Sequence, residues 1–158
     1  MVAIGGGAAL GVTKSVHHKV ALPPPPPPQA LVATLTNQRR LLAGYDAALA
    51  AHPDQAGRLA PLRADIAAHG EALRAVLEQY PGWRYAQSQP SGDASSDGLV
   101  RPAVVGELGA LAAASKQDAA SVTTACVKWP AGETQAGQVV PLLGSIAACL
   151  TSHAGVLS

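Results

Sequence analysis

The chain is 158 residues long, of which 48% are hydrophobic and 3% aromatic, and it contains no Phe. This length suits one domain with a core of Leu, Val, Ile and Ala, a composition that favours helices over strands. A formal charge of +1, with 13% charged residues and no cluster of Lys and Arg, excludes the basic surface of a nucleic-acid-binding protein.

Residues 1–29 form a separate N-terminal segment. Its apolar part, residues 2–12, has the length of the hydrophobic region of a signal peptide, but no basic residues precede it. Two interpretations therefore stay open, a secretion signal whose true start lies upstream and a Gly/Ala-rich tail. The run from Pro23 to Pro28 predicts a polyproline II spacer of about 19 Å, at ~3.1 Å per residue. We expect this segment to associate with a membrane or cell wall, which predicts an exported or cell-envelope protein; the alternative is the cytoplasm.

Residues 30–51 and 54–79 have the spacing of two bundle helices. Side chains that form a buried seam recur at alternating steps of three and four residues. In the first helix they are Leu31, Leu35, Gln38, Leu42, Tyr45 and Leu49, and in the second they are Leu59, Leu62, Ile66, His69, Leu73 and Val76. Asp54 is the expected N-cap of the second helix, and Pro61 is expected near its first turns.

Residues 81–102 are rich in Gly, Ser and Pro and predict a long crossover, with Trp83 and Tyr85 as its only large apolar anchors. Residues 103–128 predict a third helix, and a fourth starts between residues 132 and 140. Two short connections and one long one favour an all-α, antiparallel four-helix bundle of ferritin-like topology over residues 30–158. No uninterrupted run of 18 apolar residues occurs, so no membrane-spanning helix is predicted.

Each predicted helix carries one polar residue on its apolar seam: Gln38, His69, Ser115 and His153. Counting residues from the first hairpin turn places Gln38 and His69 within one helical turn of the same height along the bundle. Counting from the second turn does the same for Ser115 and His153, which predicts a polar layer. Three interpretations stay open. The layer is a set of buried polar groups that fix helix register, a single-metal site of His69, His153 and Asp65, or the polar part of a small-ligand cavity.

Two segments carry a family resemblance. They read LLAGYDAALAAHPDQAGRLAPLRADIAAHGEALRAVL at residues 41–77 and VVPLLGSIAACLTSHAGVL at residues 139–157. Both resemble the alanine-rich, ferritin-like domains of actinobacterial cell-envelope proteins, a family of largely unknown function. The resemblance covers residues 30–158. Metal-binding ferritin-like proteins use a Glu from each of two helices and a Glu-x-x-His from each of the other two.

Only half of that ligand pattern is present in this chain. His69 and His153 match the two histidines, but Gln38 and Ser115 stand on the helices that should supply the single carboxylates, and apolar residues lie three positions before both histidines. Two metal ions without bridging carboxylates lack charge compensation, so no di-iron or di-manganese cofactor is expected. Asp65, one turn before His69, is the carboxylate left to hydrogen-bond an imidazole or to bind one ion with it.

The chain contains two cysteines, Cys126 and Cys149, on the third and fourth predicted helices. In regular helices they lie on the order of 10 Å apart along the bundle axis, which disfavours a disulfide.

Together these observations favour a non-enzymatic bundle that has lost its two-metal centre and acts as a binding or structural module. We expect a monomer or weak dimer whose partner the sequence does not identify. The alternative is a metal-binding protein or a metal-dependent oxidoreductase that uses His69 and His153. A third hypothesis is a cytosolic small-ligand binder.

Overall fold

The structure, a computed structural model, describes residues 22–88, 107–130 and 135–158. The signal-like residues 2–12 lie outside this part of the chain. Within it the structure contains helices and no strand, which confirms the all-α class. The elements are, in chain order, α1 (Gln29–Ala51), the 3-10 helix η1 (Pro53–Gln55), α2 (Ala56–Leu77), α3 (Pro81–Ser88), α4 (Leu108–Val127) and α5 (Ala136–Leu157).

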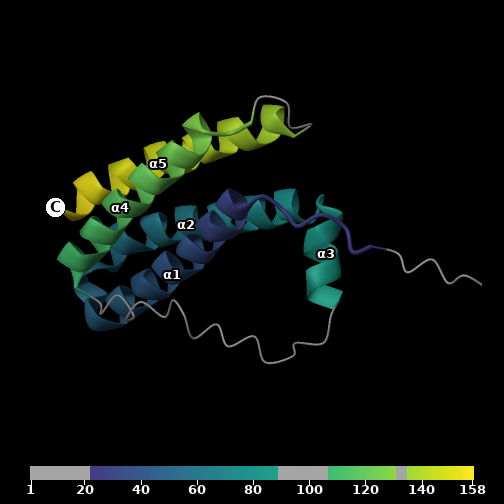
Figure 1. Cartoon of the computed structure of the whole chain (residues 1–158). Helices are drawn as coiled ribbons and strands as arrows, with labels where there is room; N and C mark the ends of the chain where they lie inside the picture. Colours follow the sequence, from purple (N-terminus) through teal and green to yellow (C-terminus); the bar gives the residue numbers. More distant parts are fainter. Residues whose placement is uncertain (1–21, 89–106, 131–134) are drawn as a thin grey trace, which may run out of the picture.

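The four long helices form two hairpins that pack against each other. Helix α1 packs along α2 and α4 along α5, and the hairpins meet where α1 contacts α4 and where α2 contacts α5. In Figure 1, α1 and α5 run in one direction and α2 and α4 in the other, so both contacts between hairpins join antiparallel helices. Antiparallel contact fixes which residues face each other, and this register positions the polar groups of the site.

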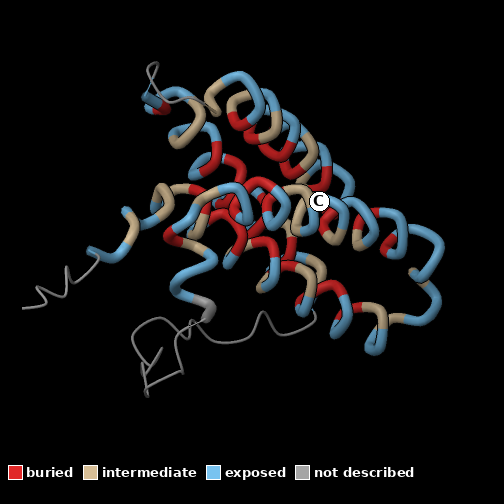
Figure 2. The backbone as a smooth tube through the Cα atoms, turned by 90° about the vertical axis from the view of Figure 1, so that its right-hand side faces the viewer, coloured by how far each residue is buried: buried red, intermediate tan, exposed pale blue. Residues whose placement is uncertain are grey.

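The core lies between the four long helices, and Figure 2 shows the buried positions on their inward faces. Its most completely buried large apolar side chains are Leu31, Leu41, Tyr45, Leu59, Ile66, Leu73, Leu77, Leu111, Leu143, Ile146 and Leu150. In α1, Leu41 and Ala48 are buried, whereas Leu42 and Leu49, which the seam pattern predicts as core, are only partly buried. Because α1 contacts both α2 and α4, its buried face is broader than a single seam.

The connection between α1 and α2 differs from the prediction at its capping residue. Asp54 lies inside η1, and Gln55 precedes α2 without a side-chain bond to that helix. The Asp54 carboxylate instead accepts a hydrogen bond of 3.1 Å from the Gln55 side chain. The prediction of Asp54 as N-cap is therefore wrong, because a 3-10 turn leads into α2 without the extended residue that a capping side chain needs. Helix α2 ends at Leu77 rather than at residue 79.

Three helices contain a proline. Pro61 and Pro141 lie inside α2 and α5, past the first turn but near the starts, as expected, whereas Pro81 is the first residue of α3. Proline is tolerated at the first position because the N–H that it lacks has no partner within the helix there. The sequence predicts an irregular crossover from residue 81, so helix α3 is a correction to that prediction.

Helix α3 contacts the proline-rich segment. Trp83 packs against the core, whereas Tyr85 is 44% exposed and is not the anchor that the sequence predicts. The backbone of Pro25 passes so close to Gly82 that a Cβ added at this glycine would lie 2.0 Å from the Pro25 carbonyl oxygen. The proline run therefore packs on the helical part of the chain and is more than a spacer. Residues 89–102 of the predicted crossover lie outside the described ranges.

Helix α5 is the one helix in the described part of the chain that is long and apolar enough to cross a membrane, by length and composition alone. The criterion of an uninterrupted apolar run misses it, because Gln138, Ser145 and His153 interrupt the helix. Leu143 and Ile146 of α5 are fully buried, and the core helix of a soluble protein meets the same criteria.

Candidate functional site

The four residues of the predicted polar layer occupy different environments. Gln38, Ser115 and His153 are 1%, 0% and 2% exposed, whereas His69 is only partly buried. His153 makes hydrogen bonds to other side chains. The other three present buried atoms without a hydrogen-bonding partner among the described residues: the amide nitrogen and oxygen of Gln38, the Ser115 hydroxyl and Nδ1 of His69. The structure therefore does not join the four by hydrogen bonds, and the site forms around His153.

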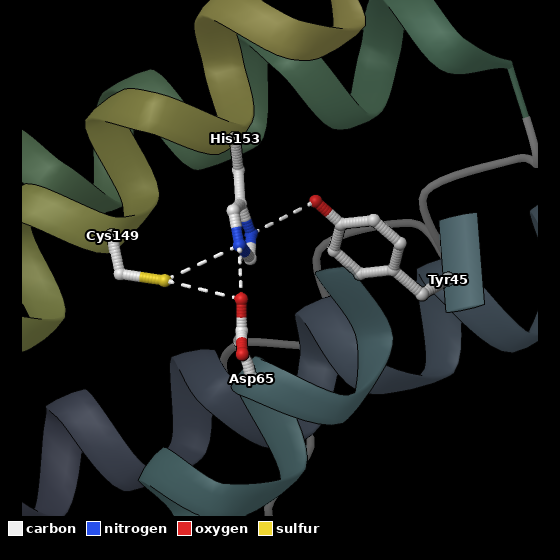
Figure 3. A network of polar contacts seen from close by, with 4 residues as sticks. All are labelled: Tyr45, Asp65, Cys149 and His153. Carbon is white, nitrogen blue, oxygen red and sulfur yellow. Dashed lines mark hydrogen bonds and ion pairs between the residues drawn. The ribbon is translucent and has the colours of Figure 1, made fainter. Parts of the chain in front are cut away.

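Three potential ligand atoms converge beside His153 (Figure 3). Its Nε2 lies 3.2 Å from Oδ2 of Asp65 and 3.2 Å from Sγ of Cys149. The third side of this triangle, from Sγ to Oδ2, measures 3.9 Å. Asp65 and His153 are predicted as site residues from the sequence, whereas Cys149 is not. A signal was present, because Cys149 and His153 are four residues apart and so share one face of α5.

Helices from both hairpins build this triangle. Asp65 comes from α2, and Cys149 and His153 come from α5, where the two hairpins touch. The His153 side chain is 2% exposed, Cys149 is partly buried, and the Asp65 side chain is 56% exposed. The cluster is thus open to solvent on the side of Asp65, while the core holds the imidazole in place.

The hydroxyl of Tyr45, on α1, contacts Nδ1, the other imidazole nitrogen of His153. This hydroxyl lies 3.3 Å from Nδ1, and the two rings meet edge to face with centroids 6.0 Å apart. Burial raises the pKa of Tyr45, the neighbouring Ser115 lowers it by less, and Cys149 and Asp65 add to the increase. Ser115 thus lies close to the phenol even though its own hydroxyl makes no well-aligned hydrogen bond. In the tautomer whose Nδ1–H donates to the Tyr45 oxygen, Nε2 carries no hydrogen and its lone pair can bind a ligand.

The cluster has the residue types of a Cys–His–Asp catalytic triad but not its arrangement. A triad places the carboxylate on one imidazole nitrogen and the nucleophile on the other. Here Asp65 and Cys149 both approach Nε2 of His153, and Tyr45 occupies Nδ1. Burial and then the Asp65 carboxylate raise the pKa of the Cys149 thiol to about 11, so its thiolate is scarce at neutral pH. The arrangement does not support nucleophilic catalysis by Cys149.

The same arrangement suits a metal ion. The three potential ligand atoms lie close enough together for one ion between them to contact all three. Tetrahedral zinc, with bonds of about 2.0 to 2.3 Å, separates its ligand atoms by about 3.4 to 3.6 Å. The observed separations of 3.2, 3.2 and 3.9 Å require only small side-chain adjustments to match.

His69 lies one turn beyond Asp65 on α2. Burial lowers the pKa of His69, the Asp65 carboxylate opposes this by less, and the charge of His153 lowers the pKa further. The neutral imidazole is therefore favoured. The single-metal site predicted from His69, His153 and Asp65 is partly assembled, because Asp65 and His153 meet while His69 stays outside the triangle.

A second polar contact joins the hairpins where α1 meets α4. Nη2 of Arg40 donates to both carboxylate oxygens of Asp118, at 3.0 and 2.9 Å, and the Asp118 side chain is only 4% exposed. Neither residue is predicted from the sequence to have a role. Only the packing of α1 on α4 brings these opposite charges together, so spacing within one helix contains no signal for the pair.

Gln38 also borders a groove of about 350 Å³ between α1 and α2. Leu35 and Ile66 line its apolar part, and Arg39 and Arg74 lie at its polar part. The amide atoms of Gln38 are buried in the core rather than accessible from the groove. The small-ligand interpretation therefore gains no polar anchor from Gln38.

Both cysteines are free thiols. Cys126 Sγ donates toward the backbone carbonyl of Val140 at 3.6 Å, whereas Cys149 belongs to the cluster around His153. This agrees with the axial offset that disfavours a disulfide between them.

Comparisons of the chain with protein-family models, with curated proteins and with solved structures found no significant match. The resemblance to ferritin-like cell-envelope domains therefore stays a prediction, and function has to be inferred from the geometry of the cluster.

Proposed function

We propose that this protein binds one divalent transition-metal ion, zinc in preference, through Asp65, Cys149 and His153. The observation that carries this proposal is the triangle of Oδ2, Sγ and Nε2, whose atoms all lie within 4.8 Å of one another. Three different ligand types, a carboxylate oxygen, a thiol sulfur and an imidazole nitrogen, approach one point from two helices.

The donor set favours zinc among the common divalent ions. Imidazole nitrogen, thiolate sulfur and carboxylate oxygen are the usual zinc ligands, whereas magnesium and calcium prefer sites made of oxygen atoms. When the ion binds, the Cys149 thiol loses its proton, and the thiolate and the Asp65 carboxylate together supply two negative charges that balance the ion. Without a cation, burial and then the neighbouring Asp65 carboxylate disfavour this thiolate, which is why the pKa of Cys149 is raised.

Tyr45 gives the site an outer shell. A histidine that binds metal through one nitrogen usually donates its other N–H to a fixed acceptor, which orients the ring and strengthens the ligand. The Tyr45 hydroxyl, 3.3 Å from Nδ1 of His153, is in position to be that acceptor. Tyr45 is a positioning residue and not itself a ligand.

The proposed metal site is related to the topology of the four long helices. We take the two hairpins to form an antiparallel four-helix bundle of ferritin-like topology, which the antiparallel α1–α4 and α2–α5 contacts support. Ferritin-like metal proteins bind two ions among all four helices, whereas here one ion would lie between α2 and α5. Gln38 and Ser115 supply no negative charge for a second ion. The protein would therefore bind metal without di-iron chemistry, and its location in the cell envelope stays a prediction.

Metal titration of the purified full-length chain tests this function. After treatment with a chelator, zinc should bind with a stoichiometry of one per chain. Cobalt in place of zinc should give a thiolate-to-metal charge-transfer band, because Cys149 is a ligand. The variant Cys149→Ser should lose this band and bind zinc at least about 100-fold more weakly, since loss of a direct ligand exceeds the usual cost of losing an outer-shell partner.

Cys126→Ser is the matched control, because Cys126 lies on α4 outside the cluster. This variant should bind zinc and cobalt as the wild-type protein does. Zinc affinity that is equal in the Cys149→Ser and Cys126→Ser variants would refute the site, and so would a cobalt complex without the charge-transfer band.

A further inference from the structure

We infer that His69 is the fourth ligand of this site, so that two residues from each hairpin hold the ion and no coordination position stays open. This inference rests on the proposed metal binding and extends it. A three-ligand zinc site keeps a position for water or substrate, as in zinc enzymes, whereas a four-ligand site is structural. The role of His69 therefore decides what kind of metal protein this is.

The register of α2 against α5 is the first support. The 3.2 Å contact between Asp65 and His153 sets these two residues opposite each other on antiparallel helices. Four residues further along α2 lies His69, and four residues back along α5 lies Cys149. Because antiparallel helices advance by the same rise in opposite directions, His69 and Cys149 also share one level. In the proposed site the four side chains would therefore stand at the corners of one quadrilateral.

The spacing within each helix is the second support. Asp65 and His69 form one pair four residues apart, and Cys149 and His153 form another. Side chains at this spacing lie on one helix face about 5 to 6 Å apart, and two such ligands can bind a single ion. One pair alone is a weak signal. Two pairs that face each other across an observed contact form a complete four-ligand set.

The state of His69 itself is the third support. Its Nδ1 is buried without a hydrogen-bonding partner in the described part of the chain, which costs stability that a metal bond would restore.

A closed site has consequences for the whole molecule. The second imidazole adds no charge, so Asp65 and Cys149 still balance the divalent ion. The ion then bridges α2 and α5, and its binding free energy stabilises the contact between the hairpins. We therefore expect a structural or carrier role for the metal, and no metal-bound water for hydrolysis.

The variant His69→Cys tests this inference, because it places a second thiol at the fourth corner. If residue 69 is a ligand, the cobalt-loaded variant has two thiolate ligands, and its charge-transfer band should be about twice as intense as that of the wild-type protein. Ala75→Cys, at an exposed position of the same helix, is the matched control and should leave the band unchanged.

The outcomes separate this inference from the proposed function. A band of wild-type intensity in the His69→Cys variant overturns the role of His69, whereas a wild-type protein without any band overturns the metal site as a whole. A second measurement needs no folded variant. In the zinc-loaded wild-type chain, the NMR signals of His69 should stop titrating with pH, and continued titration of His69 would leave a three-ligand site.

Discussion

Charged side chains lie at both contacts between the hairpins, and the two contacts differ in how their charges are compensated. Where α1 meets α4, the guanidinium of Arg40 lies 3.0 and 2.9 Å from the two carboxylate oxygens of Asp118. Where α2 meets α5, Asp65 and Cys149 both approach one nitrogen of His153. The first contact pairs opposite charges directly, whereas at the second an imidazole faces a carboxylate and a thiol, the three groups of the proposed metal site.

This difference separates a stabilising contact from the proposed binding site. A buried pair of opposite charges fixes helix register, and removal of one partner leaves the other uncompensated. A preformed metal site has the opposite property, because its ligands repel or compete with each other until the ion arrives. Substitutions at the α1–α4 contact should therefore lower the stability of the metal-free protein. Substitutions at the α2–α5 contact should instead reduce the stabilisation that added metal provides.

The largest effect is expected at the α1–α4 contact. Asp118→Ala should lower the free energy of unfolding by about 3 kcal/mol, because it leaves the Arg40 guanidinium, 22% exposed, without its carboxylate. Urea denaturation of the metal-free protein measures this value. The double variant Arg40→Met, Asp118→Leu removes both charges and should lose much less stability than Asp118→Ala. Equal losses in the two variants would contradict the assignment of Asp118 as a compensating charge.

The next effect should appear at the α2–α5 contact and only with metal. Zinc at about 100 times its Kd should raise the free energy of unfolding by about 2.7 kcal/mol, because it binds the folded chain. Asp65→Asn should remove most of this increase, since it deletes a negative ligand, while it changes the metal-free stability little because the side chain is 56% exposed. The Arg40→Met, Asp118→Leu variant should keep the full zinc effect, and loss of that effect would show that the contacts are not independent.

Much of the fold is predictable from this sequence, because periodic Leu, Val and Ile positions determine which face of a helix is buried. The all-α class and the approximate extents of α1, α2 and α5 follow from that periodicity. Helix α3 does not, because its eight residues lie in a Gly- and Pro-rich stretch and depend on the contacts of Trp83 with the core and of Gly82 with Pro25. A short helix of this kind takes its stability from tertiary packing.

The site is less predictable than the fold. His153 and Asp65 are identifiable because a polar residue on an apolar seam needs a partner, and a carboxylate one turn away from His69 is an obvious candidate. Cys149 and Tyr45 are missed because each has an ordinary role as a helix residue when its own helix is viewed alone. The ion pair of Arg40 is missed for the same reason. Contacts between helices of different hairpins depend on register, and spacing along one helix does not contain that information.

The reactivity of Cys149 provides a kinetic comparison with an ordinary thiol. In a Cys126→Ser background and without metal, Cys149 should react with iodoacetamide at pH 8 roughly 100-fold more slowly than an exposed cysteine, because its pKa is raised to about 11. The rate should keep rising with pH toward that value. Asp65→Asn should accelerate the reaction, since the carboxylate contributes to the raised pKa. A rate that levels off near pH 8.5 would show that Cys149 is not held in this environment.

The smallest expected difference between the two contacts is in how stability depends on pH. We expect this dependence at the α2–α5 contact, because the Arg40–Asp118 pair contains no histidine. The folded-state pKa of His69 lies below its ordinary value of 6.5, mainly because of burial, so the unfolded chain binds the proton more readily. The stability that the neutral His69 side chain contributes is therefore complete above pH 6.5 and is lost as the pH falls below 6.5. Urea denaturation of the metal-free protein between pH 5 and about 7.5 should show this decrease, and His69→Gln should reduce its slope. An unchanged slope in the His69→Gln variant would contradict the lowered pKa of His69 in the folded chain.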